Sequence, residues 1–346
     1  MGAICGCKRS NVVQPSSSVK TNHSSSAASK HFGGALILDL TDSGSLSKHS
    51  LADTNYNNNN ASSSEQVQQA AGAMLNEDSV LKKYNLQTVI GEGSFSKVFR
   101  IENRQTGEYF ALKITDKAKS LESGMPCYKR ELAILKRARH QNIITLHEVF
   151  HSNSKLYLIL ELASGGNLFD RISSSGAYNE PLAQRTLSMI TNALSYLHRV
   201  GVTHRDLKLE NLLYKNSRKD SKILISDFGL SHMTEGDASR NVMWTTCGSE
   251  EYIAPEVLDG LEYSNAIDNW ALGVITYAVL CAYMPFTDQN RARLHQKILS
   301  GMVSFREQPW TEVSPLGKEF ICKLLEVNPD LRLTASQALE HPWLYE

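Results

Sequence analysis

The sequence predicts an α+β fold of two lobes: a small β-rich N-lobe with one main helix, at residues 84–162, and a larger, mainly helical C-lobe, at residues 163–344. Three observations lead to this prediction. The composition changes from polar to globular near residue 80. Short β-type runs fill the region that follows, with one helical stretch among them. Beyond the glycine pair at 165–166, helical patterns dominate.

The residues before the N-lobe, 1–80, are predicted to form a disordered tail. Residues 10–80 are rich in Ser, Asn and Gln, include a run of four Asn at 57–60, and contain few aromatic residues. Such a segment cannot bury enough apolar surface to offset the entropy lost on ordering. One apolar island, residues 35–40, is either a partner-binding segment or a fluctuation in composition.

Local periodicity predicts the elements of the N-lobe in order. Residues 86–90, 97–103 and 109–115 are expected to be short strands, and residues 125–139 a helix. Further strands are expected around residues 143–150 and 155–162. These elements would form one sheet with a single main helix, and the more helical C-lobe follows.

Composition excludes several classes of function. The 36 basic and 36 acidic side chains balance, so no general attraction to nucleic acid is expected. No apolar signal segment opens the chain, and its six scattered cysteines fit a reducing cytosol. The uncharged run 271–284 has 14 residues, whereas a membrane span takes about 20, so we expect a buried helix there. A cytoplasmic protein is predicted.

The first sign of chemistry is a glycine-bearing hairpin at residues 91–98 (GEGSFSKV), between two expected strands. Glycine lets backbone N–H groups come close to a phosphate. Alone this motif is weak, because most such hairpins are only turns. It is not a Walker loop, because no Gly-Lys-Ser/Thr follows and a strand rather than a helix comes next.

A lysine on the following strand gives a sharper signal. Strand alternation puts Ala111 and Lys113 on one face, where the lysine can lie under the hairpin and pair with phosphates. A lysine drawn into a cleft needs an opposite charge. Glu131 offers one, because Leu135 lies one helical turn further along the same face and marks that face as inward. The alternative is a solvent-exposed lysine on an edge strand.

The strongest signal is a pair of polar turns, HRDLKLEN and SDFG, each next to apolar strand-like stretches. Phosphoryl transfer needs a positioned acceptor hydroxyl and metal ions that neutralise phosphate charge. Asp206 can receive the hydroxyl proton, and Lys208 can steady the γ-phosphate. Asn211 and Asp227 supply the oxygen ligands that Mg²⁺ prefers. Each tripeptide alone fits a surface turn, but coincidence does not explain the ordered set at these spacings.

In this order of motifs the sequence resembles a eukaryotic protein kinase over about three quarters of its length. It also carries APE at 254–256, DNWALG at 268–273, Arg332 and HPW at 341–343. The lysine of HRDLK is similar to the serine/threonine pattern rather than the tyrosine one. The segments GSFSKV and LASGGNLFD resemble the calcium/calmodulin-dependent kinase group. Within that group the sequence resembles the protein serine kinase H branch, whose members pair such a domain with an acylated amino terminus.

The resemblance implies a bilobal kinase fold, protein substrates, and ATP and Mg²⁺ as cofactors. Leu160 would lie behind the adenine, and backbone groups of Glu161 and Leu162 would bind it. Asp268 would brace the catalytic loop, and Glu256 and Arg332 would form a buried pair. An internal spine would contain Leu135, Leu146, His204 and Phe228. The implied nucleotide-binding residues are Ile90, Gly91, Glu92, Gly93, Ser94, Phe95, Ser96, Lys97, Val98, Ala111, Lys113, Glu131, Glu161, Leu162 and Leu213.

Several residues depart from the family pattern near the expected peptide site. Asn167 stands where related kinases often carry a glutamate, and Glu250 replaces a proline. Both changes leave the peptide preference open. Asp170 and Glu210 still favour a basic residue before the target hydroxyl. Ser96 replaces the third glycine of the hairpin, a change compatible with ATP binding.

The segment between SDFG and APE contains two threonines, Thr245 and Thr246. A phosphate on Thr245, added by autophosphorylation or by another kinase, would pair with Arg205 and order the segment. The alternative is that both threonines are ordinary polar loop residues. No basic amphipathic helix follows HPWLYE, so calmodulin is not expected as a partner.

The first nine residues, MGAICGCKR, resemble an acylation signal. Gly2 would take myristate, and Cys5 or Cys7 would take palmitate, because one myristoyl chain gives only marginal anchoring. We therefore expect the protein at the cytosolic face of the Golgi or plasma membrane. Gly6 replaces the preferred Ser/Thr, so an unmodified terminus is the alternative.

Two alternative functions would require different residues and motifs from those of a protein kinase. A non-catalytic scaffold of this fold typically lacks the lysine, the base or the metal aspartate, whereas Lys113, Asp206, Asn211 and Asp227 are all present. A kinase for lipids or small molecules would not need the protein-type segment that ends in APE. Phosphate transfer to peptides would separate these alternatives.

Overall fold

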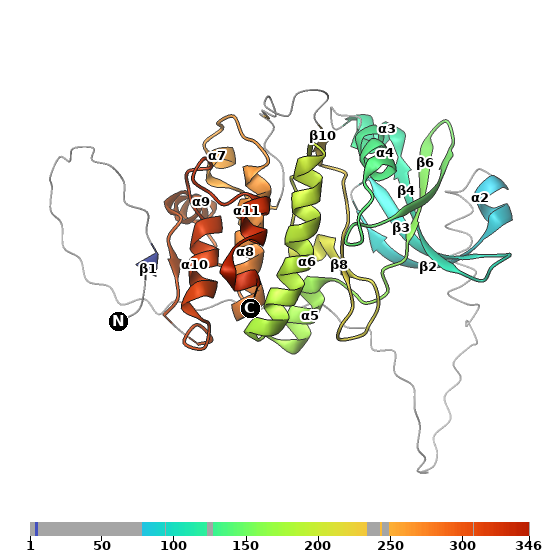
Figure 1. The fold of residues 1–346 in the computed structure, drawn as a ribbon. Helices are drawn as coiled ribbons and strands as arrows, with labels where there is room; N and C mark the ends of the chain where they lie inside the picture. Colours follow the sequence, from blue (N-terminus) through green and yellow to red (C-terminus); the bar gives the residue numbers. More distant parts are fainter. Residues whose placement is uncertain are drawn as a thin grey trace, which may run out of the picture.

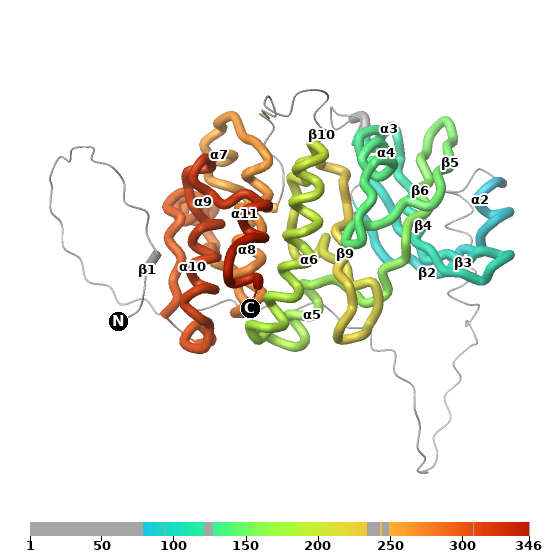
Figure 2. Tube along the Cα trace, viewed as in Figure 1, coloured from blue at the N-terminus to red at the C-terminus, as the bar shows by residue number. Residues whose placement is uncertain are grey.

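The computed structural model describes residues 4–5, 78–93, 95–122, 127–233, 243, 249–306 and 308–345. Its β-sheet lies on one side of the molecule and most of its helices lie on the other, with α6 in between (Figure 1). The same division is visible along the chain trace (Figure 2). The predicted α+β fold of two lobes is confirmed.

The N-lobe contains a five-stranded sheet with the order β2-β3-β4-β6-β5. All neighbouring strands pair antiparallel, and β6 lies between β4 and the edge strand β5. The strands are β2 (Tyr84–Glu92), β3 (Ser96–Asn103), β4 (Tyr109–Asp116), β5 (Leu146–His151) and β6 (Lys155–Glu161).

The fifth strand begins later than the sequence suggested. Residues 143–144 were expected in it, but they bond to the C-lobe instead. Ile143 forms a bridge with Ile225, and the Ile144 N–H donates to the Ile225 carbonyl at 3.0 Å. The approach to β5 therefore ties the two lobes together, and the strand starts at Leu146.

Three helices accompany this sheet. The expected main helix is α4 (Cys127–Arg137). The helices α2 (Asp78–Lys83) and α3 (Lys117–Glu122) were not predicted, because six residues are too few to display a helical period. Val80 is 1% exposed, so the folded part includes the last residues of the segment that was expected to be disordered.

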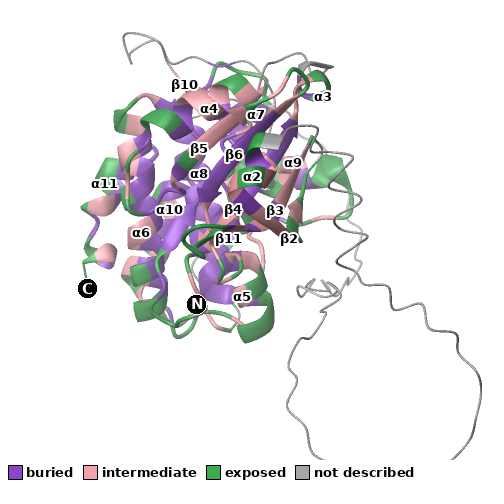
Figure 3. Cartoon of the chain, turned by 90° about the vertical axis from the view of Figure 1, so that its right-hand side faces the viewer, coloured by how far each residue is buried: buried purple, intermediate pink, exposed green. Residues whose placement is uncertain are grey.

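The two faces of the sheet have different neighbours. Val80 and the outward residues of the strands form a separate small core. Inward residues such as Ala111, Leu158 and Leu160 join the main core. Figure 3 shows buried residues along the inner strand β6 and exposed residues on the outer helices. Strand alternation thus places Lys113, between Leu112 and Ile114, on the inner face, as predicted.

The C-lobe is built around α8 (Ala266–Cys281), every residue of which is buried. The uncharged run 271–284 was expected to be a buried helix, and its residues 271–281 lie in α8. No helix in the described part of the chain is long and apolar enough to cross a bilayer. The other helices are α5 (Leu168–Ser175), α6 (Glu180–Arg199), α7 (Pro255–Leu258), α9 (Arg291–Ser300), α10 (Pro315–Leu324) and α11 (Ala335–Leu339).

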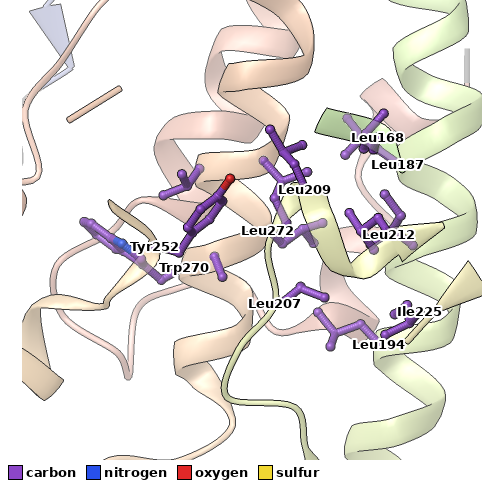
Figure 4. Close-up of a cluster of buried hydrophobic side chains, with 14 of the residues drawn as sticks. Leu168, Leu187, Leu194, Leu207, Leu209, Leu212, Ile225, Tyr252, Trp270 and Leu272 are labelled. Carbon is purple, nitrogen blue, oxygen red and sulfur yellow. The ribbon is translucent and has the colours of Figure 1, made fainter. Parts of the chain in front are cut away.

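Apolar residues in and beside the HRDLKLEN segment anchor it to the C-lobe core. Leu207, Leu209 and Leu212 lie in one buried cluster with Leu194 of α6 and Leu272 of α8 (Figure 4). All five are at most 2% exposed. The apolar side chains between the polar ones fix this loop, so its polar side chains can be held in place on the other side.

Short strand pairs complete the C-lobe. β8 (Leu212–Tyr214) pairs with β9 (Ile223–Ile225), and β7 (Val202–Thr203) pairs with β10 (His232–Met233). At the other end of the lobe, β1 (Ile4–Cys5) pairs with β11 (Val303–Ser304). The rest of the first 77 residues lies outside the described part, so the predicted disorder there stays a prediction.

Described cysteines occur in two states. Cys127 and Cys281 have free thiols, and Cys281 is buried in α8. Cys322 of α10 is disulfide-bonded, which the scattered cysteine pattern did not suggest.

A buried ion pair fastens the end of the APE motif to the last part of the domain. Arg332 Nη1 and Nη2 donate to Glu256 Oε1 and Oε2 at 2.7 and 2.8 Å. Both side chains are almost inaccessible, at 0% and 4% exposure. The pairing expected from the resemblance is present.

We expect Glu256→Ala to lower the free energy of unfolding by about 3–5 kcal/mol, because the Arg332 charge would remain buried without its counter-ion. Urea unfolding followed by tryptophan fluorescence measures this change. Glu319→Ala is the matched control, because Glu319 pairs with Lys323 at the surface, where both side chains are about half exposed. Equal losses in the two variants would contradict a structural role for the buried pair.

Candidate active site

A cavity of about 740 Å³ lies between the sheet of the N-lobe and the loops of the C-lobe. The glycine hairpin and strands β3 and β4 line one side, and residues of β6 and β8, the loop after β6 and the turn after β9 line the other. Most of the residues that the sequence assigned to nucleotide and metal line it. They are Ile90, Gly91, Glu92, Gly93, Ser96, Val98, Ala111, Lys113, Glu131, Glu161, Leu162, Leu213, Asn211 and Asp227.

Two predicted hairpin residues lie away from the cavity. Ser96 and Val98 line it, so alternation along β3 turns Lys97 to the other face, where its ammonium pairs with Glu92 at 2.9 Å. Phe95 is exposed on the hairpin, and its backbone carbonyl accepts the Asp116 N–H at 3.1 Å. Ser94 lies outside the described residues. Of the hairpin residues assigned to the nucleotide site, Phe95 and Lys97 therefore do not line the cavity in this structure.

The lysine of β4 lies between two carboxylates. Lys113 Nζ is 2.7 Å from Glu131 Oε1 and 2.9 Å from Asp227 Oδ1. Burial alone would lower the pKa of Lys113, but the two carboxylates raise it above its ordinary value. In return, the Lys113 charge lowers the pKa of Asp227 to about 2. The pair that the sequence suggested between Lys113 and Glu131 is present, and the charged lysine also reaches the SDFG turn.

The HRDLKLEN turn gathers its polar groups around Asp206. Lys208 Nζ lies 2.9 Å from Asp206 Oδ2 and donates to Ser249 Oγ at 3.0 Å. Ser249 Oγ donates to Asp206 Oδ1 at 3.3 Å. Asn211 Nδ2 donates to the backbone carbonyl of Asp206 at 2.8 Å. Both Asp206 oxygens therefore have partners that hold the carboxylate in one orientation.

Ser249 is a site residue that sequence reasoning missed. It comes from a segment more than forty residues after Asp206, and a lone serine in a polar loop has no period or spacing that indicates such a contact. The sequence offered one signal for a role in the site, namely that Ser249 lies in the segment that ends in APE. Through Ser249 the substrate-facing segment touches the expected base.

Asp268, in the first turn of α8, supports the turn from below. Its carboxylate accepts the backbone N–H groups of His204 at 2.8 Å and Arg205 at 2.9 Å, and His198 Nε2 at 2.9 Å. Arg205 has a φ of 70°, a left-handed conformation that is costly for a residue with a side chain. The expected brace between α8 and the catalytic loop is present.

The residues expected to form an internal spine lie in one buried region. Leu135, Leu146, His204 and Phe228 are all at most 9% exposed. The His204 and Phe228 rings contact each other edge to face, with centroids 5.2 Å apart. Phe228 is thus inside, and Asp227, with a φ of 60°, faces the cavity.

The lining residues fit ATP and Mg²⁺. Ala111, Leu160 and Leu213 provide apolar walls for an adenine, and Lys113 provides a cation for phosphates. The Asn211 amide nitrogen is engaged by Asp206, so its oxygen is the group left for a metal. Among the described residues no cluster of three His, Cys, Asp or Glu could hold a metal ion. Asn211 and Asp227 would therefore hold Mg²⁺ together with phosphate oxygens.

The rim of the cavity on the C-lobe side is acidic. Asp170 and Glu210 both line it, and burial raises the pKa of Glu210 above its ordinary value. Asn167, the departure noted in the sequence, caps α5 by accepting the Asp170 N–H at 2.7 Å. Glu250, the other departure, pairs with Arg291 of α9 at 2.7 Å. Asn167 thus has a structural use, and the charge of Glu250 is balanced within the chain.

Comparison with known proteins agrees with this geometry. The profile of the protein kinase domain matches residues 84–344. The chain is 49% identical over 265 residues to serine/threonine-protein kinase H1 homolog of Danio rerio and 49% identical over 266 residues to serine/threonine-protein kinase H1 of Homo sapiens. Each alignment covers 77% of this chain and 62% of the relative. Serine/threonine-protein kinase H2 of Homo sapiens is 45% identical over 266 residues, 77% of this chain and 68% of the relative.

The chain thus spans about 62% of the length of the H1 proteins that it matches. What is shared is the region that contains every site residue described above. A matched domain profile over most of the chain, together with 45–49% identity, is far more specific than any of the motifs alone. This chain belongs to the protein kinase family, in its serine/threonine-protein kinase H branch.

Proposed function

We propose that the protein transfers the γ-phosphate of ATP to serine and threonine hydroxyls of protein substrates. One observation carries the proposal: Lys113, Asn211 and Asp227 line one cavity, and Asp206 and Lys208 lie on the adjoining loop in mutual contact. The serine/threonine specificity is supported by the lysine two residues after Asp206 and by the H1 and H2 relatives, which are named serine/threonine-protein kinases.

The acceptor hydroxyl would be handled by the HRDLKLEN turn. Asp206, oriented by Lys208 and Ser249, accepts the proton of the hydroxyl as its oxygen attacks the γ-phosphorus. Lys208 lies beside the carboxylate and offers its charge to the phosphate that is being transferred. Because Ser249 belongs to the substrate-facing segment, binding of a peptide and orientation of the base are coupled.

The donor would be positioned from the other side of the cavity. Lys113 binds phosphate oxygens and is kept in place by Glu131, and the backbone of the glycine hairpin covers the phosphates. When bound, Mg²⁺ neutralises charge on the phosphates. Asn211 and Asp227 would hold it, and the phosphate donor would then lie close to Asp206 and the acceptor hydroxyl.

Two alternatives are less consistent with these contacts. A scaffold that had lost chemistry would have no reason to keep Lys113 paired with both Glu131 and Asp227. A kinase for small molecules would not need Ser249 of the peptide-facing segment against its base. The proposal therefore keeps protein substrates.

The experiment is a transfer assay with the purified full chain, γ-labelled ATP and a panel of acceptors. The panel contains serine, threonine and tyrosine peptides, a phosphoinositide and a small alcohol. Label on serine and threonine peptides alone, lost when Mg²⁺ is withheld, supports the proposal. Label on the lipid or the alcohol, or none on any acceptor, refutes it.

A basic residue before the target hydroxyl is proposed as the substrate preference. Asp170 and Glu210 give the rim of the cavity a negative charge, and Glu251 adds to the field around Glu210. Asn167 caps α5, and the rim lacks the negative charge that a glutamate at this position would add. The preference should therefore rest on Asp170 and Glu210, and a positional peptide library is the direct measurement.

Membrane attachment is proposed for the amino terminus, with myristate on Gly2, palmitate on Cys5 or Cys7, and residence at the cytosolic face of the Golgi or plasma membrane. The support is the sequence MGAICGCKR, which combines an acceptor glycine, two cysteines and two cations. Of this segment the structure describes only residues 4–5, as strand β1. Two acyl chains would give the stable anchoring that one cannot.

We expect Gly2→Ala to move the protein from the membrane fraction to the soluble fraction of transfected cells. Without myristate the protein also loses the first membrane contact that precedes palmitoylation. Fractionation and labelling with an alkyne fatty acid measure both losses. Ala3→Gly, which keeps Gly2, is the matched control, and a Gly2→Ala protein that stays on membranes would remove myristate from the proposal.

Autophosphorylation is proposed as part of the same activity. Thr245 and Thr246 are the acceptors that the sequence suggests, and both lie outside the described residues. Mass analysis of the chain after incubation with ATP, compared with the Thr245→Ala, Thr246→Ala double variant, identifies the acceptor.

A further inference from the structure

The side chain of Arg205, the residue before Asp206, is hydrogen-bonded to a tyrosine. Arg205 Nη2 donates to the hydroxyl of Tyr263 at 2.8 Å, and the guanidinium carbon lies 5.7 Å from the centroid of the Tyr263 ring. Both residues are buried, at 7% and 5% exposure. A charged group at this depth depends strongly on such a partner.

The backbone of Tyr263 makes a second connection, to the activation segment between SDFG and APE. Its N–H donates to the Met243 carbonyl at 3.2 Å, and the Met243 N–H donates to the Tyr263 carbonyl at 2.9 Å. The two residues form an antiparallel bridge, and Met243 is only 4% exposed. Tyr263 therefore bonds to the catalytic loop through its hydroxyl and to the activation segment through its backbone.

A third connection comes from the same stretch of chain. Asp268, at the start of α8, accepts the backbone N–H of Arg205, while Tyr263 accepts from its side chain. Arg205 is thus held at both ends by residues 263–268, and its left-handed backbone needs such support. Asp268 belongs to the fully buried helix α8, and Tyr263 lies three residues before that helix begins.

We propose that Tyr263 is a positioning residue that holds the activation segment to the catalytic loop without any phosphate, and so gives the unphosphorylated protein a basal activity. A phosphate on a loop commonly orders that loop by pairing with an arginine. Here a phosphate on Thr245 or Thr246 would add a further anchor to an arginine that is already held. This inference rests on the proposed phosphotransfer activity.

The first test removes only the hydroxyl, in a chain that cannot carry the phosphate. In the Thr245→Ala, Thr246→Ala background, Tyr263→Phe should lower kcat by roughly tenfold, about the value of one hydrogen bond to a buried charge. The KM for ATP should not change, because Tyr263 does not line the nucleotide cavity. Tyr178→Phe is the matched control, since it removes a tyrosine hydroxyl that bonds to Tyr214 at 2.9 Å elsewhere in the same lobe.

The second test uses the wild-type background, with the phosphate content measured by intact mass. If the segment is phosphorylated, Tyr263→Phe should cost less activity than in the alanine background, because the phosphate also holds Arg205. A merely structural role would give equal fractional losses in both backgrounds, which would overturn the proposal. If the segment carries no phosphate, the wild-type chain is itself the unphosphorylated case and the tenfold loss is required there.

Two further outcomes have a definite meaning. Complete loss of activity in the alanine background with Tyr263 intact, while the wild type is active, overturns the basal activity. A loss of less than twofold on Tyr263→Phe in the unphosphorylated chain overturns the role of the hydroxyl. Absence of transfer by the wild type refutes the proposed function instead, so the two failures are distinguishable.

Discussion

Replacing Asp227 by alanine should reduce phosphate transfer by roughly a thousandfold or more, the loss expected when a group that stabilises transition-state charge is removed. That factor corresponds to about 4 kcal/mol of transition-state stabilisation. Asp227 lines the cavity, and Lys113 lowers its pKa to about 2, so its carboxylate is charged at neutral pH and can bind a metal. Without it, Asn211 alone of the expected pair would hold Mg²⁺.

The measurement is the initial rate of peptide phosphorylation at saturating ATP over a range of Mg²⁺ concentrations. The variant should stay folded, because Lys113 keeps its 2.7 Å pair with Glu131. Asp220→Ala is the control, since Asp220 is an exposed turn residue close in sequence to Asp227. Equal, measurable incorporation by Asp227→Ala and wild type would refute the mechanism.

The parts of the fold and site that could be predicted are those where many neighbouring residues follow one hydrophobic pattern. Period-two alternation in FALKI placed Lys113 on the inner face of the sheet. Phe110, Leu112 and Ile114 are apolar and share the outer face. The uncharged run of α8 was too short to span a membrane, so it was expected to be a buried helix. Hydrophobic burial acts on many residues at once, so such patterns survive in the sequence.

Parts that depend on single long-range contacts could not be predicted. Ser249 reaches Asp206, and Tyr263 reaches Arg205, through one hydroxyl each. Nothing in a lone serine or tyrosine indicates its partner until the fold brings the two segments together. The same holds for Asn167, whose identity suggested a changed substrate contact but whose side chain is used to cap α5. Lys97 was assigned together with its motif, whereas strand alternation turns its side chain toward Glu92.

Replacing Asp206 by asparagine should lower kcat by roughly a hundred- to ten-thousandfold, the range expected for a lost general base. Asparagine has nearly the same shape, and Asn211 bonds to the backbone carbonyl of residue 206, so the loop should keep its conformation. What changes is chemical: an amide cannot accept the hydroxyl proton, and Lys208 loses the carboxylate that lies 2.9 Å away. The KM for ATP should stay close to that of the wild type, because Asp206 does not line the nucleotide cavity.

Glu210→Gln separates this loss from a general effect of removing negative charge near the substrate. Glu210 lines the acidic rim four residues further along, so its replacement should raise KM for peptides with a basic residue and leave kcat nearly unchanged. Single-turnover rates and peptide titrations of both variants give the two parameters. If Asp206→Asn instead raised KM and kept kcat, Asp206 would be a substrate-binding residue, and proton acceptance would have to be reassigned. A base must act in the chemical step, so only a loss in kcat is consistent with the contacts that orient Asp206.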